Sequence, residues 1–465
     1  MTKKQFRHDM RRGLGTCILE LQRTGDLAKY EEDVLWGCGH LLAFDTQCEG
    51  TRAWLLNQLI RMYEDRNLFR DTLARTAEKK IRDMDWLFEQ AAETLCFMAE
   101  EGDAEAKEIM LSLYERVVSE LSRRRGRKNG TFPEEDTFES LCNMMLLNLY
   151  EDVEQQLAFY QRVQRDLENI RQRNPWIRDR LDLDWFEDNA QELLGEYYPS
   201  GCQADGDTEQ GNAETAVEKQ NKDCKKIKMS VKHLTAKEVY QIICAGGKFG
   251  KDFRGGQINH WKKQGREDEM GLLERLYVKE QDTIVKTELL KVLRFSCMSR
   301  MGHRVTDGGV IACMINDAQS EDTELAEAAW QALNRVKKSQ VARKFALRTL
   351  QAEPMHADAL SVLVLNGKAE DRKLAESLIK TFKGERHREE LHHISFRVTD
   401  RCDEDGKKKY FTNDLLMYLF YENPCSYCRY HILELLDERG CVTEEMKEQC
   451  RYDSNEDIRA FYESE

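Results

Sequence analysis

Apolar residues recur along most of the chain at the spacing of an amphipathic helix. In residues 322–336 they stand at i, i+3, i+4, i+7, i+8 and i+11, namely Leu325, Ala328, Ala329, Ala332, Leu333 and Val336. This spacing places them in one stripe along a helix. A turn at residues 338–340 and a second amphipathic segment at 341–350 follow. Because neither stripe is buried by its own helix, the pattern predicts helix pairs that stack on further pairs.

The same pattern occurs twice in the second half of the chain. Residues 282–293 align without gaps on residues 322–333, at an offset within the range of two-helix repeats. Residues 322–333 and 339–346, with a capping residue, aliphatic and small residues, resemble the HEAT repeat. Residues 453–459 share this resemblance, whereas residues 102–111, in the first half of the chain, resemble it more weakly. The resemblance implies a HEAT-like α-solenoid of stacked antiparallel helix pairs, similar to uncharacterised bacterial HEAT-repeat proteins, and implies no activity.

Proline usage and loop composition define the fold class and its division. The chain has only five prolines in 465 residues, and all five stand at predicted helix ends. Proline is excluded from helix interiors, so this scarcity predicts an all-α protein. Residues 199–228 are polar, rich in glycine and without apolar period, which predicts a flexible linker. It separates an N-terminal helical-repeat block, 1–198, from a C-terminal HEAT-like block, 229–465.

Charge and cysteine content indicate which classes of partner are disfavoured and which cellular compartment to expect. The formal net charge of −14 disfavours non-specific binding to nucleic acid or anionic membrane. No apolar run approaches the roughly 18 residues of a membrane span, and the first ten residues lack an apolar leader region. Fifteen scattered cysteines are typical of reduced thiols. We therefore expect a cytoplasmic protein with no membrane contact.

The first candidate site is a polar cluster at residues 44–54. Its candidate binding residues are Asp45, Gln47, Cys48, Glu49 and Arg52. Carboxylates at a helix start cap free N–H groups, so the cluster predicts a capped helix entrance that doubles as a binding surface. A nucleophilic pair of Cys48 with His40 is the alternative.

The second candidate is a basic segment between Lys248 and Arg266. Lys248, Lys251 and Arg254 precede Trp261, and basic residues with an aromatic ring can bind single-stranded nucleic acid. A phosphate-binding P-loop is excluded, because the glycine spacing is too short and Asp252 stands where a hydroxyl is required. The alternative is an exposed loop on a charged protein.

The third candidate is a group of cysteines near the end of the chain. Cys425, Cys428, Cys441 and Cys450 could supply four thiolates to a tetrahedral zinc ion, with His431 as a substitute ligand. A redox-active Cys-x-x-Cys pair and buried structural thiols are the alternatives. Zinc is the one cofactor that the sequence suggests.

These observations favour a non-enzymatic scaffold that binds a protein partner through a helical-repeat surface. The first alternative is a nucleic-acid-binding HEAT-like protein that contacts DNA or RNA through the Lys248–Arg266 segment, resembling the alkylated-base glycosylases built on this repeat. The second alternative is a zinc-containing protein that uses the four cysteines. No motif requires an enzyme.

Overall fold

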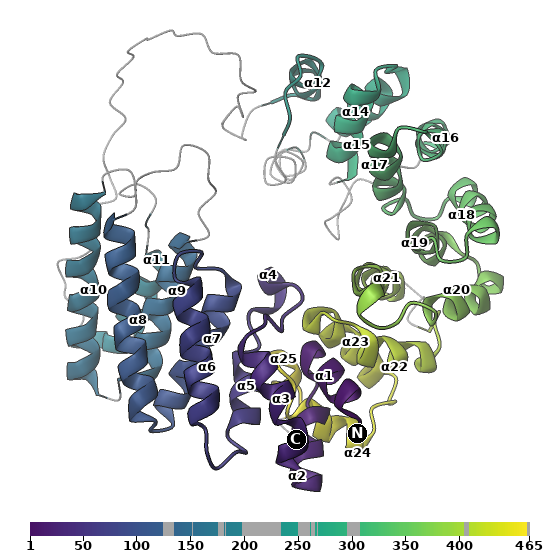
Figure 1. Cartoon of the computed structure of the whole chain (residues 1–465). Helices are drawn as coiled ribbons and strands as arrows, with labels where there is room; N and C mark the ends of the chain where they lie inside the picture. The colour runs from purple at the N-terminus through teal and green to yellow at the C-terminus, as the bar shows by residue number, and fades with distance from the viewer. Residues whose placement is uncertain are drawn as a thin grey trace, which may run out of the picture. The chain divides into compact units, whose positions relative to one another are not determined.

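The computed structural model describes residues 1–123, 134–150, 152–174, 181, 183–197, 234–249, 261, 266, 268–294, 307–403 and 409–462. These residues contain 24 α-helices and no strand, which confirms the all-α prediction (Figure 1). The predicted linker at 199–228 lies outside them. The chain forms two compact units, unit 1 from Met1–Gly211 with Asn423–Glu465, and unit 2 from Asn212–Glu422.

This division differs from the predicted one at the end of the chain. The predicted C-terminal block ran from 229 to 465, whereas the residues from Asn423 onward pack with the N-terminal helices. Loop composition reveals where helices stop, but it carries no information about which distant helices pack together. The difference therefore comes from contacts between segments far apart in the sequence.

Unit 1 begins with eleven helices in succession. They are α1 (Lys3–Arg12), α2 (Thr16–Thr24), α3 (Leu27–Cys38), α4 (Thr46–Glu49), α5 (Ala53–Ile60), α6 (Asn67–Lys80), α7 (Trp86–Glu100), α8 (Ala104–Arg123), α9 (Glu134–Asn148), α10 (Val153–Arg173) and α11 (Asp184–Leu194), with a 3₁₀ turn at Gly195–Tyr197. The end of the chain adds α23 (Ser426–Glu438), α24 (Glu444–Cys450) and α25 (Glu456–Ala460).

Helix α7 lies at the centre of unit 1 and packs against α5, α6, α8 and α9. Its N-cap Asp85 accepts hydrogen bonds from the N–H groups of Leu87 and Phe88, which fixes where the helix begins. Phe88, Leu95 and Cys96 are completely buried in the core of this unit. The same core extends from α1 to α11.

The two ends of unit 1 are joined by a close backbone contact. Gly13, which ends α1 with a φ of +72°, accepts a hydrogen bond from the Ser454 N–H at 2.8 Å. A Cβ atom on Gly13 would lie 1.9 Å from Ser454 Oγ, so only glycine fits. Arg459 of α25 also lies over the Trp54 ring at 3.9 Å. Figure 1 shows the purple N-terminal helices beside the yellow C-terminal ones.

Unit 2 contains the remaining helices. They are α12 (Ala236–Cys244), α14 (Asp268–Lys279), α15 (Thr283–Leu293), α16 (Gly308–Asp317), α17 (Thr323–Leu333), α18 (Gln340–Ala352), α19 (Ala357–Asn366), α20 (Arg372–Ile379), α21 (Arg388–Cys402) and α22 (Asn413–Glu422). Short 3₁₀ turns at Ala369–Asp371 and Glu385–His387 precede α20 and α21.

Helices of unit 2 pack both on the next helix and on the next but one. Helix α15 packs against α17, α17 against α19, and α19 against α21, while α14 packs against α16 and α16 against α18. Each helix of one row also contacts a neighbour in the other, as α16 with α17 and α18 with α19 do. Consecutive helix packing of this kind is consistent with stacked helix pairs.

The repeat seen in the sequence corresponds to two equivalent helices. Asp282 caps α15 and Asp322 caps α17, each through hydrogen bonds from the N–H groups two and three residues later. Ser339 caps α18, the second helix predicted after the repeat. The predicted helices of both copies are thus confirmed to within a few residues.

None of the described helices is both long enough and apolar enough to cross a lipid bilayer.

Candidate functional site

The first predicted cluster folds into the one-turn helix α4 and the loop that follows it. Gln47 and Cys48 are exposed on this turn, and the Asp45 carbonyl accepts the N–H groups of Cys48 and Glu49. Arg52 is buried at the start of α5. The cluster therefore has an exposed part at Gln47 and Cys48, a half-buried Asp45, and a part at Glu49 and Arg52 whose side chains are buried.

The Glu49 carboxylate joins this cluster to the C-terminal segment of unit 1. One oxygen accepts hydrogen bonds from the N–H groups of Phe44 and Asp45. The other accepts from the Ser426 N–H and hydroxyl, both at 2.7 Å, and from Arg52 at 2.9 Å. Burial raises the pKa of Glu49, but Arg52 and the Ser426 donors outweigh it and lower the pKa to about 2. Glu49 is therefore ionised at neutral pH and fully engaged by groups of its own chain.

The Arg52 guanidinium completes the connection. It donates to the carbonyl oxygen of Pro424 at 2.7 Å, to that of Leu42 at 3.0 Å, and to that of Arg11. Its side chain is only 1% exposed. Arg52 thus connects three segments of unit 1 through their backbone carbonyl oxygens, which is a structural role. Ligand binding by Glu49 and Arg52 stays a prediction.

Cys48 lies close to two of the cysteines that the sequence grouped near the C-terminus. Partial desolvation, the Asp45 carboxylate and the neighbouring Cys425 raise the pKa of the Cys48 thiol to about 11. Cys425 and Cys428 are both buried. The pKa of the Cys428 thiol is raised, mainly by its hydrogen bond with the Cys425 thiol and secondly by its burial. The structure thus brings parts of the first and third predicted sites into one place in unit 1.

The other two cysteines lie elsewhere in the same unit. Cys441 is in the loop before α24 and donates to the Arg439 carbonyl, and Cys450 is buried at the end of α24, where burial raises its pKa to about 12. Among the described residues, neither joins Cys425 and Cys428 in a group of potential metal ligands. Of the predicted four-cysteine cluster, the structure assembles the pair Cys425 and Cys428, and zinc binding stays a prediction.

The position of Cys48 predicts its reactivity. Because the Asp45 carboxylate disfavours the thiolate, Asp45→Asn should lower the Cys48 pKa and speed its alkylation by iodoacetamide at pH 8. We expect an increase of about 3- to 10-fold, equivalent to half to one pKa unit. Peptide mass spectrometry against time measures Cys48 alone. Asp26→Asn, an exposed aspartate distant in sequence, serves as control, and equal rates in both variants would contradict this electrostatic assignment.

The predicted basic segment is only partly described. Lys248 is exposed after α12, while Lys251 and Arg254 lie outside the described residues. Trp261 is completely buried in unit 2, where its Nε1–H donates to the Leu234 carbonyl at 2.8 Å. The Trp261 ring is thus part of the core and offers no exposed face on which a base could stack.

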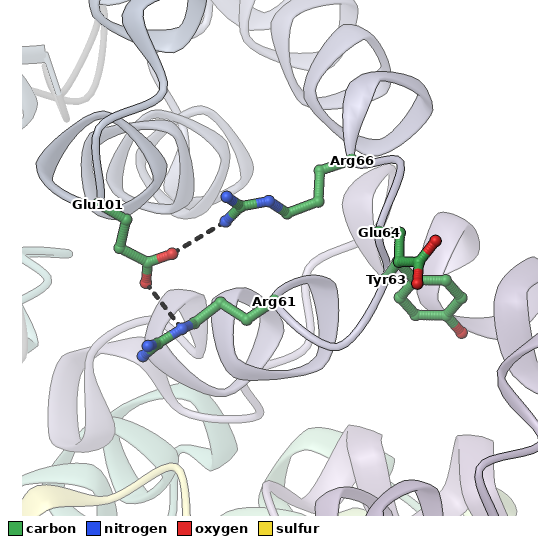
Figure 2. A pocket seen from close by; sticks show the side chains of 5 residues that line it. All are labelled: Arg61, Tyr63, Glu64, Arg66 and Glu101. Carbon is green, nitrogen blue, oxygen red and sulfur yellow. Dashed lines mark hydrogen bonds and ion pairs between the residues drawn. The ribbon is translucent and has the colours of Figure 1, made fainter.

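A polar hollow of about 470 Å³ lies where α5, α6 and α7 of unit 1 meet (Figure 2). Glu101 bridges two arginines across it, with Arg61 at 3.3 Å and Arg66 at 3.0 Å. Glu64 and Tyr63 line the opposite side. Because the arginines share a carboxylate already, the hollow has no strong preference for a charged ligand, and its residues mainly fix the helix ends.

Two exposed tryptophans were missed by reasoning from the sequence. Trp86 at the start of α7 is 38% exposed, and Trp185 at the start of α11 is 55% exposed. Each follows an aspartate in the pattern Asp-x-Asp-Trp, at residues 83–86 and 182–185. This recurrence is the signal that could have found them, since aspartate is common at helix starts and the following residue then lies in the first turn.

Comparison of the chain with models of known protein families and with curated proteins gives no match. Its function therefore has to be inferred from its own residues and contacts.

Proposed function

We propose that the chain is a non-enzymatic scaffold whose helical-repeat surface binds a protein partner. In this proposal unit 2 is a HEAT-like α-solenoid. The supporting features are the equivalent Asp-capped helices α15 and α17, the packing of each helix on the next but one, and the resemblance of residues 322–346 to the HEAT repeat. Repeats of this kind present extended surfaces that suit protein ligands.

The observation that carries the proposal is the pair of exposed tryptophans in unit 1. Tryptophan is enriched among the residues that dominate binding energy at protein interfaces. An exposed Trp ring also keeps a large apolar area in contact with water, which partner binding would remove. Trp86 and Trp185 are therefore the best candidates for anchors on this protein.

The helices place both rings at the same end of a parallel row. Helix α9 lies between α7 and α11, and all three begin at this end. The Thr137 hydroxyl of α9 donates to the Met84 carbonyl just before α7 at 2.9 Å. Glu139 of α9 accepts the N–H of Phe186 in α11 at 3.0 Å. The starts of α7, α9 and α11 are thus connected by hydrogen bonds, and two of them carry an exposed tryptophan. We treat this region as one candidate interface and call it the tryptophan edge (Trp86 and Trp185).

Acidic residues surround both anchors, which suggests the chemistry of the partner. Asp83 and Asp85 precede Trp86 and share one cation, Lys80, so this group of three charges keeps one excess negative charge. Asp184 and Asp188 are exposed beside Trp185. An arginine- or lysine-rich protein segment suits this edge, because it can pair with the carboxylates and place cations over the indole rings.

We expect Trp86→Ala combined with Trp185→Ala to reduce recovery of the partner at least about tenfold, since anchor residues at interfaces commonly contribute 2 kcal/mol or more. Immobilised full-length protein, incubated with extract of its native cells, should retain a defined protein that quantitative mass spectrometry identifies. Both residues are exposed, so circular dichroism should show an unchanged fold.

Leu68→Ala combined with Leu147→Ala is the matched control. These leucines are 47% and 48% exposed. Leu68 lies at the start of α6 and Leu147 at the end of α9, away from the helix starts that carry the two tryptophans. If both double variants lose the partner equally, the tryptophan edge is not the binding surface. If treatment of the extract with nuclease abolishes retention, nucleic acid and not protein is the partner.

A further inference from the structure

A second hollow, of about 410 Å³, lies in unit 2 where the segments after α17 and α19 meet the last turn of α21. Three cationic side chains line it, Lys338, Lys368 and Arg401, together with the amides of Gln340 and Asn366. No acidic residue among those described lines the hollow. It is thus a positively charged site on a chain whose net charge is −14.

Hydrogen bonds of Asn366 hold two walls of the hollow together. Its side chain is buried, accepts the Ser339 N–H at 2.8 Å and donates to the Val336 carbonyl at 2.8 Å. Lys338 lies between these two contacts in the left-handed conformation, with a φ of +59°. The turn that carries Lys338 is therefore fixed against the end of α19.

Arg401 and Tyr410 hold the third wall. The Arg401 guanidinium is buried and donates to the carbonyl oxygens of Leu365 and Gly367, both at 3.0 Å. It lies 4.9 Å from the centre of the Tyr410 ring, whose hydroxyl donates to the Lys368 carbonyl at 2.6 Å. The backbone around Lys368 is thus fixed by two hydrogen bonds, one from Arg401 to the Gly367 carbonyl and one from Tyr410 to the Lys368 carbonyl.

Two carboxylates close in sequence to the lining residues are bound by other cations. Asp371 accepts two hydrogen bonds from Arg343 and one from the Lys368 N–H. Asp400 forms an ion pair with Lys337. The ammonium groups of Lys338 and Lys368 make no ion pair with any residue in the described part of the chain. The positive charges of these two lysines are therefore available to a ligand.

We propose that this hollow binds the phosphate group of a small phosphomonoester. Lysine is a usual phosphate-binding side chain that acts as a mobile point charge, and here Lys338 and Lys368 supply two such charges. Arg401 adds positive charge at the wall while its Nη groups hold the Leu365 and Gly367 carbonyls. The volume falls within the range of small-molecule sites and exceeds what a bare phosphate ion fills. This site is separate from the tryptophan edge of unit 1 and is independent of the proposed scaffold function.

The test is isothermal titration of the full-length protein with O-phosphoserine, inorganic phosphate and serine at equal ionic strength. We expect saturable binding of phosphoserine, weaker binding of phosphate and none of serine. Lys338→Ala combined with Lys368→Ala should weaken phosphoserine binding at least about tenfold, because a hydrogen bond to a charged group contributes enough for that factor.

Lys344→Ala combined with Lys373→Ala removes the same charge from α18 and α20, at exposed lysines that do not line the hollow. This control should bind phosphoserine within about twofold of the unaltered protein, since distant exposed charges are screened by salt. Equal weakening by both double variants, or no saturable binding of phosphoserine, would overturn the site. Phosphate binding as tight as phosphoserine would overturn the assignment to an ester.

Discussion

Asp453→Ala should lower the free energy of unfolding by about 3–5 kcal/mol, the usual cost of leaving one partner of a buried ion pair uncompensated. Arg429 is completely buried in α23, and its guanidinium donates to both carboxylate oxygens of Asp453, with Nη2 at 2.9 Å from Oδ1. Asp453 also accepts the Asn455 N–H at the start of α25. Loss of the Asp453 carboxylate would leave the buried Arg429 charge without a counter-ion, and it would remove the hydrogen bond that holds the turn between α24 and α25. Urea denaturation measures the effect.

A matched substitution separates this effect from a general loss of charge. Asp457 lies in the same segment but is exposed, so Asp457→Ala should change the free energy of unfolding by less than about 0.5 kcal/mol. Arg429→Met combined with Asp453→Leu should recover much of the stability, because it removes both charges and keeps the buried volume filled. A loss for Asp453→Ala as small as that for Asp457→Ala would show that the pair is not essential.

Glu49→Gln should reduce the free energy of unfolding by roughly 3 kcal/mol at pH 7. This value corresponds to the lowering of the Glu49 pKa from 4.5 to about 2, at 1.36 kcal/mol per pKa unit. The physical cause is that buried Arg52 and the Ser426 donors stabilise the ionised carboxylate in the folded state only. The glutamine cannot compensate the Arg52 charge.

The pH dependence of the Glu49 contribution has a definite sign. Because the folded-state pKa of Glu49 is depressed, its stabilisation is complete above the unfolded value of 4.5 and is lost as the pH falls toward about 2. At pH 3.5 about 1.4 kcal/mol of it should be gone, the equivalent of one pKa unit. The difference between the unaltered protein and Glu49→Gln should shrink accordingly in urea denaturation at pH 7, 5 and 3.5.

Glu445→Gln provides the comparison, because Glu445 is exposed in α24 and should contribute little at any of these pH values. If the difference between the unaltered protein and Glu49→Gln were independent of pH, the ionisation of Glu49 would not be the source of its stabilisation. The Glu49 carboxylate would then act through packing alone.

The helices themselves could be predicted because their signals are local. The apolar stripe of residues 325–336, the capping residues Asp282, Asp322 and Ser339, and the scarcity of proline all act within a few residues of the chain. Capping bonds and stripe periodicity are set by backbone geometry over one or two turns. For the same reason the all-α class followed from the sequence alone.

The candidate sites depended on contacts that no local pattern contains. Glu49 accepts a hydrogen bond from Ser426, 377 positions later in the sequence, and Cys48 lies close to Cys425. The polar cluster at residues 44–54 and part of the C-terminal cysteine group, predicted as separate sites, therefore lie together. Trp261 was expected to offer an exposed ring beside basic residues, yet it is fully buried. Its environment is decided by the helices that pack around it, and these are not encoded near residue 261.

The sequence by itself thus determined where helices form, that no strand is needed, and that a repeated helix occurs in the second half of the chain. Only the tertiary structure decided that the residues from Asn423 onward belong with the N-terminal helices. It alone also showed that Trp86 and Trp185 are exposed at one end of a helix row, and that three cations line one hollow. The reason is physical, since helix formation depends on neighbouring residues, whereas burial and charge clustering depend on which distant surfaces pack together.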